Sequence, residues 1–460
     1  MDIDQTIFRA YDIRGIVTKN LTAPVVHLIG QAIGSETLAA GEKTIFIGRD
    51  GRLSGPELSK ALAEGIAASG CDVVDLGMVP TPVLYFATHI FDTHSGVMLT
   101  GSHNPSDYNG LKVVIAGETL ALDRIQKLYQ RIVRNDLSEG QGKIRQENLL
   151  PNYTKQILGD IKVKRRLKIV IDCGNGVGGT VLPELYQHLG CDVECLFCKI
   201  DGNFPNHHPD PTQMKNLQDL IHAVKHHRAD IGLAFDGDCD RLGLVTNEGE
   251  NIWPDRTLMV FAIDVLSRNP GAKILYDIKC TSHLKDLIRS YNGTPIMWNT
   301  GHSFIKEKMQ AEPKVLLAGE MSGHMFFRER WYGFDDAIYA GARLLEIISK
   351  QDKTVGEIFR ALPNSVNTPE LRLPIDDAEK FVFMKKFTQE ASFSEGEVIT
   401  IDGVRVDFPQ YGGFGLIRPS NTTPYLILRF EANTEEELKK IQDIFRKEIL
   451  KVNPKLELPF

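Results

Sequence analysis

The sequence predicts an α/β protein, because segments typical of strands alternate with segments typical of helices. Residues 44–48 form an apolar run typical of a strand, and residues 71–76 form another. Between them, apolar side chains recur at helical spacing over residues 56–68, and a proline opens that segment, where proline suits the first turn.

The same alternation continues in two further units. A polar stretch containing a proline, residues 146–153, predicts a first boundary. A strand over 168–172 and a helix from about residue 182 then open a second unit. A third unit begins near Trp253 with a strand over 273–276. The similar openings of the three units indicate a weak internal repeat.

The C-terminal part has a different sequence pattern, which begins after residues 362–364. Residues 398–408 and 425–430 are typical of strands, and a helix over 435–450 follows Thr434 as its cap and opens with three glutamates. These features predict an α+β tail domain. The expected domains are 1–150, 151–252, 253–365 and 366–460.

The composition of the chain argues against several classes of protein. The chain has 460 residues, of which 42% are hydrophobic and 25% charged, and its net charge of -7 argues against non-specific nucleic-acid binding. The N-terminus is acidic and lacks the apolar core of a secretory signal, and no stretch approaches a membrane span. We therefore expect a cytoplasmic monomer with neither nucleic-acid nor membrane partners.

The seven cysteines predict neither a disulfide scaffold nor a zinc site. Cys195 and Cys198 form one C-x-x-C with Cys191 nearby, but no second pair lies at zinc spacing. Residues 192–198 are typical of a strand, so we expect buried free thiols in a reducing compartment.

A serine loop follows the apolar run 96–99. In residues 100–105, Gly101 removes bulk beside Ser102, and Pro105 keeps the preceding residue out of a helix. Loops at strand ends carry much of protein chemistry, although an ordinary turn serine is the alternative.

The strongest chemical signal is the run Asp236-Gly237-Asp238-Cys239-Asp240. Three carboxylates so close repel one another unless a cation neutralises them, and oxygen ligands at this spacing suit Mg²⁺ or Mn²⁺. A solvated acidic turn is the alternative, but apolar strands on both sides disfavour it. The loop lacks the glycine and the glutamate that an EF-hand requires.

Two further polar loops fit a phosphorylated sugar. Glu320, Ser322 and His324 offer a carboxylate, a hydroxyl and an imidazole for vicinal hydroxyl groups, and residues 301–303 form a weaker loop of the same kind. Residues 418–423 combine a guanidinium, three hydroxyls and an amide, which suits a phosphate dianion. Ordinary polar loops remain the alternative for both.

A glycine run, Gly174-x-Gly176-x-x-Gly179, follows the strand over 168–172, and Asp201 lies near the acidic position of a dinucleotide fingerprint. The alternative is that these glycines permit close packing of a helix against a strand.

Taken in order, the serine, aspartate, Glu320 and Arg418 loops resemble those of the α-D-phosphohexomutases over the whole chain. The opening residues 8–15 and Met321 are similar to the bacterial phosphomannomutase/phosphoglucomutase branch. One departure is Pro419, where a small residue is usual, and we expect it to stiffen the loop without changing the chemistry.

The resemblance implies four domains around a central cleft, with the first three related in topology. It implies interconversion of the 1- and 6-phosphates of mannose and glucose through a phosphoserine at Ser102 and a hexose 1,6-bisphosphate, which also primes the serine. Mg²⁺ would be held by Ser102, Asp236, Asp238 and Asp240, and the catalytic candidates besides Ser102 are Arg14, Lys112, His103 and His324. The implied substrate-binding residues are Tyr11, Arg241, Lys279, His302, Glu320, Met321, Ser322, Gly323, Arg418, Pro419, Ser420, Asn421 and Thr422.

Three other functions remain open at this point. A phosphoglucosamine mutase would share the same loops. An NAD(P)-dependent dehydrogenase would use the glycine run but leave the aspartates unexplained. A sugar-phosphate-binding protein would bind without turning over.

Overall fold

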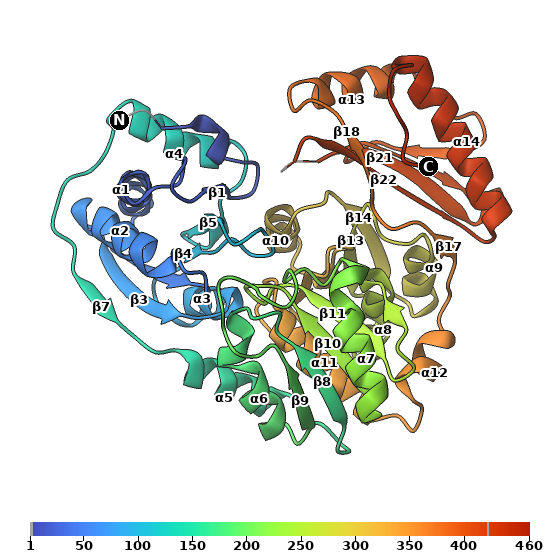
Figure 1. Ribbon diagram of the computed structural model, residues 1–460, viewed down its shortest axis with the longest axis horizontal. Coiled ribbons are helices and arrows are strands. Elements are labelled where there is room, and N and C mark those ends of the chain that lie inside the picture. Colours follow the sequence, from blue (N-terminus) through green and yellow to red (C-terminus); the bar gives the residue numbers. More distant parts are fainter. Residues whose placement is uncertain (1–2, 421–422) are drawn as a thin grey trace.

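The computed structural model describes residues 3–420 and 423–460, which form four sheet-based domains around a central cavity (Figure 1). The prediction of three α/β domains followed by an α+β domain is confirmed. Among the helices within these ranges, none is long and apolar enough to cross a membrane.

The first domain has a mixed sheet in the order β1-β5-β4-β2-β3-β7, with β6 beside β5. Strands β3, β2 and β4 are parallel, and β5 runs back antiparallel to β4. Its elements are η1 (Gln5–Ile7), β1 (Ile13–Ile16), α1 (Ala23–Ala39), β2 (Thr44–Arg49), α2 (Gly55–Ala68), β3 (Asp72–Met78), α3 (Thr81–Ile90), β4 (Gly96–Leu99), β5 (Tyr108–Ile115), β6 (Glu118–Thr119), α4 (Asp123–Val133) and β7 (Ile144–Gln146).

The second domain has a sheet in the order β12-β11-β10-β8-β9. Strands β9, β8 and β10 are parallel, and β11 is antiparallel to β10. Its elements are α5 (Leu150–Asp160), β8 (Lys168–Asp172), η2 (Val177–Thr180), α6 (Leu182–His188), β9 (Asp192–Leu196), η3 (Met214–Leu217), α7 (Gln218–His227), β10 (Ile231–Phe235), β11 (Leu242–Thr246) and β12 (Asn251–Ile252).

The third domain has a sheet in the order β14-β13-β15-β16. Again three strands are parallel, and the last, β16, is antiparallel to β15. Its elements are α8 (Pro254–Arg268), β13 (Lys273–Asp277), α9 (His283–Ser290), β14 (Thr294–Trp298), α10 (His302–Ala311), β15 (Val315–Gly319), β16 (Met325–Phe327), α11 (Ala337–Ser349) and α12 (Val355–Arg360).

The C-terminal domain, orange and red at the upper right of Figure 1, has an antiparallel sheet in the order β17-β22-β21-β20-β19, with β18 beside β22. Helices α13 and α14 pack on this sheet. Its elements are β17 (Val366–Asn367), β18 (Leu371–Pro374), α13 (Glu379–Glu390), β19 (Glu397–Ile399), β20 (Val404–Phe408), η4 (Pro409–Tyr411), β21 (Gly413–Pro419), β22 (Tyr425–Ala432) and α14 (Glu435–Val452).

The first three sheets contain the same four-strand pattern, three parallel strands and one antiparallel strand. In each, the last two strands form a hairpin: β4–β5, β10–β11 and β15–β16. The internal repeat expected from the sequence is therefore a repeat of topology. Each hairpin carries one polar loop of the sequence analysis, so equivalent positions of three domains are directed at one cavity.

Apolar packing sets the C-terminal domain apart from the other three, although the first domain also has a cluster of its own that includes Ile33 and Leu62. One cluster runs through the first three domains, from Phe46 through Tyr186 to Phe359, so these domains share a core. The C-terminal domain has its own cluster around Phe430 and Phe445. A small group, Ile278, Phe414 and Leu416, lies between the two parts.

The strands and helices expected from the sequence agree with the structure, with two differences. The strand expected over 192–198 ends at Leu196, because Phe197 adopts a left-handed conformation with φ 50°. Residues 398–408 form parts of two antiparallel strands, β19 and β20, joined by a turn that includes Gly403 at φ 80°.

Candidate active site

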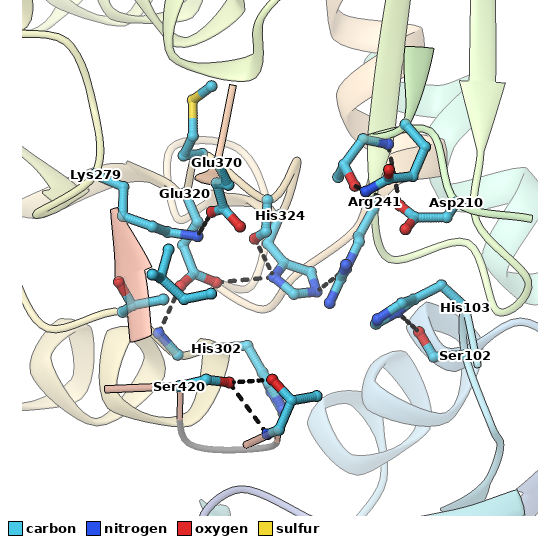
Figure 2. Close-up of a pocket in the computed structure, with 18 of the residues that line it drawn as sticks. Ser102, His103, Asp210, Arg241, Lys279, His302, Glu320, His324, Glu370 and Ser420 are labelled. Atoms are coloured by element: carbon cyan, nitrogen blue, oxygen red, sulfur yellow. Dashed lines mark hydrogen bonds and ion pairs between the residues drawn. The ribbon is translucent and has the colours of Figure 1, made fainter. Parts of the chain in front are cut away.

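A cavity of about 760 Å³ lies where the four domains meet, and every domain contributes side chains to its lining. Figure 2 shows Ser102 from the first domain, Arg241 from the second, Glu320 from the third and Ser420 from the fourth around the same space. The four polar loops selected from the sequence therefore converge on one site.

Ser102 lies at the buried end of this cavity, in the turn after β4. Its backbone is left-handed, with φ 48°, and only 2% of the residue is exposed. The Ser102 N–H donates to Thr100 Oγ1 at 2.8 Å, and Thr100 Oγ1 donates to Asp50 Oδ2 at 2.8 Å. Such a conformation persists only where the surroundings hold it.

The group that holds the serine loop is Arg52, which sequence reasoning missed. Its buried guanidinium donates to the carbonyl oxygens of Ser102 at 2.8 Å and Asn104 at 2.6 Å, and pairs with Asp50 at 3.2 Å. A Cβ on Gly101 would lie 2.3 Å from this guanidinium, which explains the glycine. The available signal was an Asp-Gly-Arg run directly after a strand.

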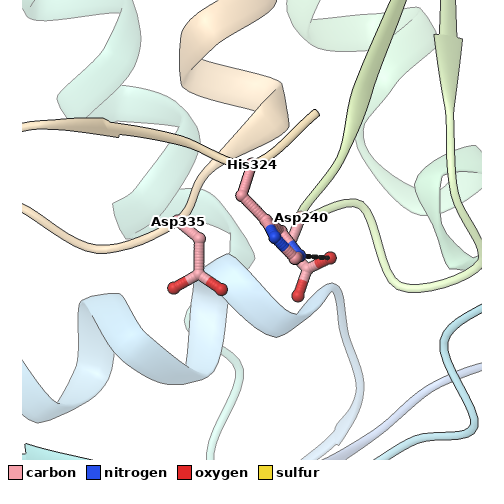
Figure 3. A group of neighbouring side chains, drawn as sticks. All are labelled: Asp240, His324 and Asp335. Atoms are coloured by element: carbon pink, nitrogen blue, oxygen red, sulfur yellow. Dashed lines mark ion pairs between the residues drawn. The ribbon is translucent and has the colours of Figure 1, made fainter. Parts of the chain in front are cut away.

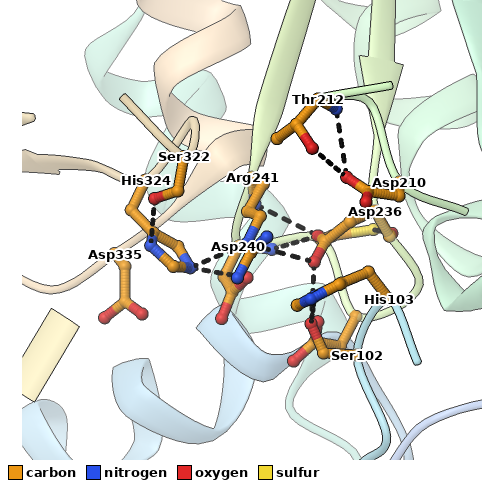
Figure 4. A network of polar contacts seen from close by, with 12 residues as sticks. Ser102, His103, Asp210, Thr212, Asp236, Asp240, Arg241, Ser322, His324 and Asp335 are labelled. Carbon is orange, nitrogen blue, oxygen red and sulfur yellow. Dashed lines mark hydrogen bonds and ion pairs between the residues drawn. The ribbon is translucent and has the colours of Figure 1, made fainter. Parts of the chain in front are cut away.

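The three aspartates of the β10–β11 loop are fully buried, and Figure 4 shows Asp236 and Asp240 near Ser102. Ser102 Oγ donates to Asp236 Oδ2 at 2.9 Å. Oxygen atoms of Asp236, Asp238 and Asp240 all lie within 4.8 Å of one another. One acceptor, Asp238 Oδ1, is buried without a hydrogen-bond partner. Clustered carboxylates with an unpartnered oxygen fit a hard divalent cation such as Mg²⁺.

Charge at this loop is balanced by Lys112. Its Nζ lies 2.7 Å from Asp238 Oδ2 and also pairs with Asp240. Burial alone would lower the pKa of Lys112, but these carboxylates outweigh burial and raise it. Burial raises the pKa of Asp236 well above its ordinary range, and the neighbouring carboxylates raise it further. A proton or a cation is therefore favoured at Asp236.

A second group of possible metal ligands, Asp240, His324 and Asp335 (Figure 3), shares Asp240 with the first. Lys306 Nζ is 2.9 Å from Asp335 Oδ1, and Lys112 pairs with Asp240. Because the raised pKa of His324 keeps its ring protonated, and a protonated imidazole cannot ligate a metal, we assign this group to structure rather than to a second metal.

The β15–β16 loop directs Glu320 and His324 at the cavity. Glu320 Oε1 accepts from the Gly301 N–H at 2.6 Å, and Glu320 Oε2 lies 2.8 Å from His324 Nδ1. Ser322 Oγ is 3.0 Å from the same nitrogen. Gly323 has φ 99°, which lets the loop turn back into β16, and Met321 lines the cavity.

His324 connects the β15–β16 loop to the aspartate loop. Its Nε2 lies 3.2 Å from Asp240 Oδ1 and 3.3 Å from Arg241 Nε. Burial would lower the pKa of His324, but Asp240 and Glu320 raise it to about 9. The ring is therefore an imidazolium at neutral pH.

Arg14 and His103, the other catalytic candidates, lie beside the serine loop and line the cavity. Arg14 donates to the Gly101 carbonyl at 3.2 Å and pairs with Asp12. His103 Nδ1 is 3.1 Å from Ser102 Oγ. Burial lowers the pKa of His103 well below its ordinary value, so this ring is neutral.

Three predicted contacts form the wall toward the C-terminal domain. Tyr11 donates to the Thr300 carbonyl at 2.9 Å, and its ring lies edge-on to His302. Lys279 Nζ pairs with Glu370, which sequence reasoning missed because it lies 91 positions away in the chain.

The β21–β22 loop completes the site. Arg418 is 4% exposed and its Nε donates to Asp402 Oδ2 at 2.9 Å, which leaves the rest of the guanidinium at the cavity. Ser420 Oγ lies 2.7 Å from Thr423 Oγ1, and Pro419 ends β21. The predicted residues Asn421 and Thr422 lie outside the described ranges.

The glycine run lies behind the aspartate loop rather than along the cavity lining. The Val177 N–H donates to the Gly237 carbonyl at 3.1 Å, and a Cβ on Gly176 would lie 2.8 Å from that oxygen. These glycines serve close packing.

Comparison with known families matches all four domains. The models described as Phosphoglucomutase/phosphomannomutase, alpha/beta/alpha domains I, II and III, match residues 5–139, 151–249 and 253–366. The C-terminal domain model of the same family matches residues 370–448.

Individual relatives agree along the whole chain. A phosphomannomutase/phosphoglucomutase of Pseudomonas aeruginosa is 56% identical over 455 residues, covering 99% of this chain and 98% of that protein. A phosphoglucomutase of Neisseria meningitidis is 51% identical over 462 residues, covering 100% of this chain and 99% of that protein. The crystal structure of a phosphoglucomutase/phosphomannomutase family protein from Burkholderia thailandensis matches with a TM-score of 0.95 and 51% identity, covering both chains fully.

Proposed function

This chain belongs to the phosphoglucomutase/phosphomannomutase family of isomerases, as the resemblance implied, and we propose that it carries out the family's reaction through Ser102. The reaction interconverts the 1- and 6-phosphates of mannose and of glucose. The observation that carries the assignment of Ser102 is its hydroxyl, 2.9 Å from Asp236, at the buried end of a cavity lined by all four domains.

Ser102 would hold the phosphoryl group between turnovers. In the first transfer its P–O bond breaks while a bond forms to the free hydroxyl of a hexose phosphate, giving a hexose 1,6-bisphosphate. In the second transfer the other phosphoryl group returns to Ser102 Oγ. Phosphoryl transfer depends mainly on positioning and charge stabilisation, and the rigid loop around Arg52 supports both.

Asp236, Asp238 and Asp240, together with an oxygen on Ser102, would hold Mg²⁺. The bound ion supplies positive charge that neutralises the transferring phosphoryl group. Lys112 supplies further charge from the protein itself, because its ammonium already lies among the same carboxylates.

Proton transfer at the reacting hydroxyl is assigned to His324. Its ring lies between Glu320, on the sugar side, and Asp240, on the serine side. The neutral form of His324 would accept the proton of the reacting hydroxyl and its imidazolium would return it, whereas Arg14 and Lys112 would stabilise charge. His103 would orient the Ser102 oxygen.

The far end of the substrate would be held by the other two loops. Glu320 and Ser322 would accept or donate hydrogen bonds to sugar hydroxyls, and Arg418 and Ser420 would bind the non-reacting phosphate. Tyr11, Lys279, Arg241 and His302 line the space between them. Because both phosphates of the bisphosphate are dianions, one such site serves either orientation.

Coupled assays of mannose 1-phosphate and glucose 1-phosphate, with Mg²⁺ and a trace of glucose 1,6-bisphosphate as primer, test this proposal. We expect turnover of both sugars, loss with EDTA and recovery with Mg²⁺. Ser102→Ala should lower kcat at least about 10³-fold while leaving substrate binding intact. Ser106→Ala, an exposed serine of the same loop, is the matched control.

Near-normal turnover by Ser102→Ala would refute the role of that serine. Binding without turnover by the wild type would favour a sugar-phosphate-binding protein. Faster turnover of glucosamine 6-phosphate than of either hexose phosphate would favour a phosphoglucosamine mutase.

Three coarser properties complete the proposal. All seven cysteines are free thiols, which supports a cytoplasmic location. The active form would be a monomer, because all four domains of one chain line the same cavity. The domain boundaries would lie near residues 150, 252 and 365, between the sheets.

A further inference from the structure

The second domain contains a cluster of thiols that the proposed function does not use. Cys173 follows β8, Cys195 lies on β9 and Cys198 follows β9. The Sγ atoms of Cys173 and Cys198 are 3.4 Å apart. Cys173 is fully buried, Cys198 is half-buried and Cys195 is exposed. The pair therefore joins an interior thiol to one within reach of solvent.

The backbone explains why these two thiols meet. Strands β8 and β9 are parallel with Asp172 opposite Leu196, and the Cys173 N–H donates to the Leu196 carbonyl at 3.1 Å. Phe197 then takes the left-handed conformation, and its carbonyl accepts from the Asn175 N–H at 2.9 Å. This turn brings Cys198 back toward Cys173 across the ends of the two strands.

The same turn touches the proposed active site through a chain of close backbone contacts. A Cβ on Gly179 would lie 1.9 Å from the Cys198 carbonyl oxygen, and a Cβ on Gly176 would lie 2.8 Å from the Gly237 carbonyl oxygen. A Cβ on Gly237 would in turn lie 2.5 Å from the Ser102 carbonyl oxygen. Because these backbone segments are in close contact, a displacement of Cys198 would also displace the aspartate loop.

We propose that Cys173 and Cys198 are an oxidation site that closes to a disulfide on reaction with a hydroperoxide and thereby displaces the glycine run under the aspartate loop. A disulfide requires the sulfurs to approach from 3.4 Å to about 2.05 Å, and we expect this approach to draw the two strand ends together. Residues 174–179 are the segment joined directly to Cys173.

The reaction uses hydrogen peroxide as the oxidant. The Cys198 thiolate attacks one peroxide oxygen, the O–O bond breaks, and hydroxide leaves and is protonated to water. Cys198 is then a sulfenic acid. Cys173 Sγ attacks that sulfur, the S–S bond forms, the S–O bond breaks, and hydroxide leaves with the thiol proton as a second water. Two thiols lose two electrons and one peroxide gains them.

Electrostatics favours Cys198 as the attacking thiol. The hydrogen bond from the Cys173 thiol lowers the pKa of Cys198, whereas the same contact and burial raise the pKa of Cys173. Burial raises the pKa of Cys195 to about 12, so the exposed cysteine is the poorer nucleophile. Thiolates, not thiols, react with peroxide.

Peptide mapping separates the possible products. Digestion with trypsin and a glutamate-specific protease yields residues 169–184, with Cys173 alone, residues 185–194, with Cys191 alone, and residues 195–199, with Cys195 and Cys198. The full-length enzyme is treated with peroxide, alkylated and digested without reductant. We expect peptides 169–184 and 195–199 to be joined, with the loss of two hydrogens.

Cysteine-to-serine variants show which sulfur atoms form the bridge. Cys195→Ser should still give the joined peptides, and Cys198→Ser should not. Cys173→Ser should stop at a sulfenic acid on Cys198 that dimedone captures. Cys71→Ser, a buried cysteine of the first domain, is the matched control and should behave as wild type. A bridge inside 195–199, or no bridge when Cys195→Ser is oxidised, would overturn the proposal.

The consequence for the active site is tested separately. Oxidised wild-type enzyme should need about tenfold more Mg²⁺ for half-maximal turnover, equal to about 1.4 kcal/mol, and dithiothreitol should restore it. Oxidised Cys198→Ser should show no such shift. A bridge that forms without any shift in Mg²⁺ dependence would overturn the link to the aspartate loop. The mapping does not depend on turnover, so failure of the proposed function would be distinguishable.

Discussion

The first three domains and the C-terminal domain are joined in different ways. Domains one to three share a continuous apolar core in which Tyr186, Phe261 and Tyr339 are almost fully buried. The C-terminal domain meets them through one small apolar group and through buried charges, with Arg429 3.1 Å from Asp255 and Glu431 accepting from the Ser282 N–H at 3.0 Å. An apolar core is close-packed and tolerates little displacement, whereas a few directed ion pairs define one docked position.

This difference between the two junctions has a consequence for the loops that form the site. The serine, aspartate and Glu320 loops stand on the shared core, so their relative positions are set by packing. The Arg418 loop stands on a domain whose docking depends on polar contacts. We therefore expect chemistry to be sensitive to the three-domain core, and phosphate binding to be sensitive to the C-terminal junction.

The largest effect should come from opening the shared core. Phe261→Ala removes a ring that packs at 4.9 Å from Phe327 and should lower the free energy of unfolding by about 3–5 kcal/mol. Hydrogen exchange measured by mass spectrometry should rise across all three sheets but not in residues 366–460.

Phe445→Ala, the equivalent change in the separate core, should raise exchange only in the C-terminal domain. Phe381→Ala, on the exposed face of α13, is the control and should change neither. Loss of protection in all four domains in both core variants would contradict the division into two parts.

Breaking the junction should have the next largest effect. Arg429→Met leaves Asp255 buried without its cation, and removing one partner of a buried pair costs about 3 kcal/mol or more. Exchange should rise at residues 281–282, where the two parts touch, while both cores stay protected. Lys440→Met, at an exposed ion pair on α14, should leave exchange unchanged.

A smaller effect is expected at the phosphate loop. Arg418→Lys keeps the charge but loses the planar fork, so KM should rise about tenfold, equal to about 1.4 kcal/mol, with kcat little changed. Arg372→Lys, at an exposed arginine of β18 that also lines the cavity, is the control. A fall in kcat at constant KM would mean that Arg418 acts on the transferring group instead.

The smallest effect concerns pH. Burial raises the pKa of Asp336 to about 7, although it accepts hydrogen bonds from the Tyr339 N–H, Tyr153 and Trp331. Because the folded pKa is raised, this carboxyl group stabilises the fold fully below the unfolded value of about 4, and that contribution is lost as pH rises through about 7.

Asp336→Asn should therefore flatten the pH dependence of Tm over that window by a few degrees. The variant should also be less stable at every pH, because an amide nitrogen replaces one acceptor oxygen. An unchanged slope of Tm against pH would contradict the raised pKa.

The sequence predicted features that consecutive residues form better than it predicted contacts between residues far apart in the chain. The Asp236 loop and the serine loop are recognisable because their chemistry is carried by consecutive residues. Arg52 and Glu370 were missed because their partners, the carbonyls after Ser102 and the Lys279 ammonium, are 50 and 91 positions away. The glycine run was ambiguous because close packing and dinucleotide binding require the same small residues, and only the contact with Gly237 distinguishes them.

The repeated hairpins have a consequence for the history of this chain. Duplication of one ancestral unit would place three copies of the same loop around a common axis, each free to acquire a separate task. Under the proposed function, one copy would carry the group to be transferred, one would hold the cation and one would bind the sugar. Substrate preference can therefore drift in the third copy while selection preserves the transfer apparatus of the first two.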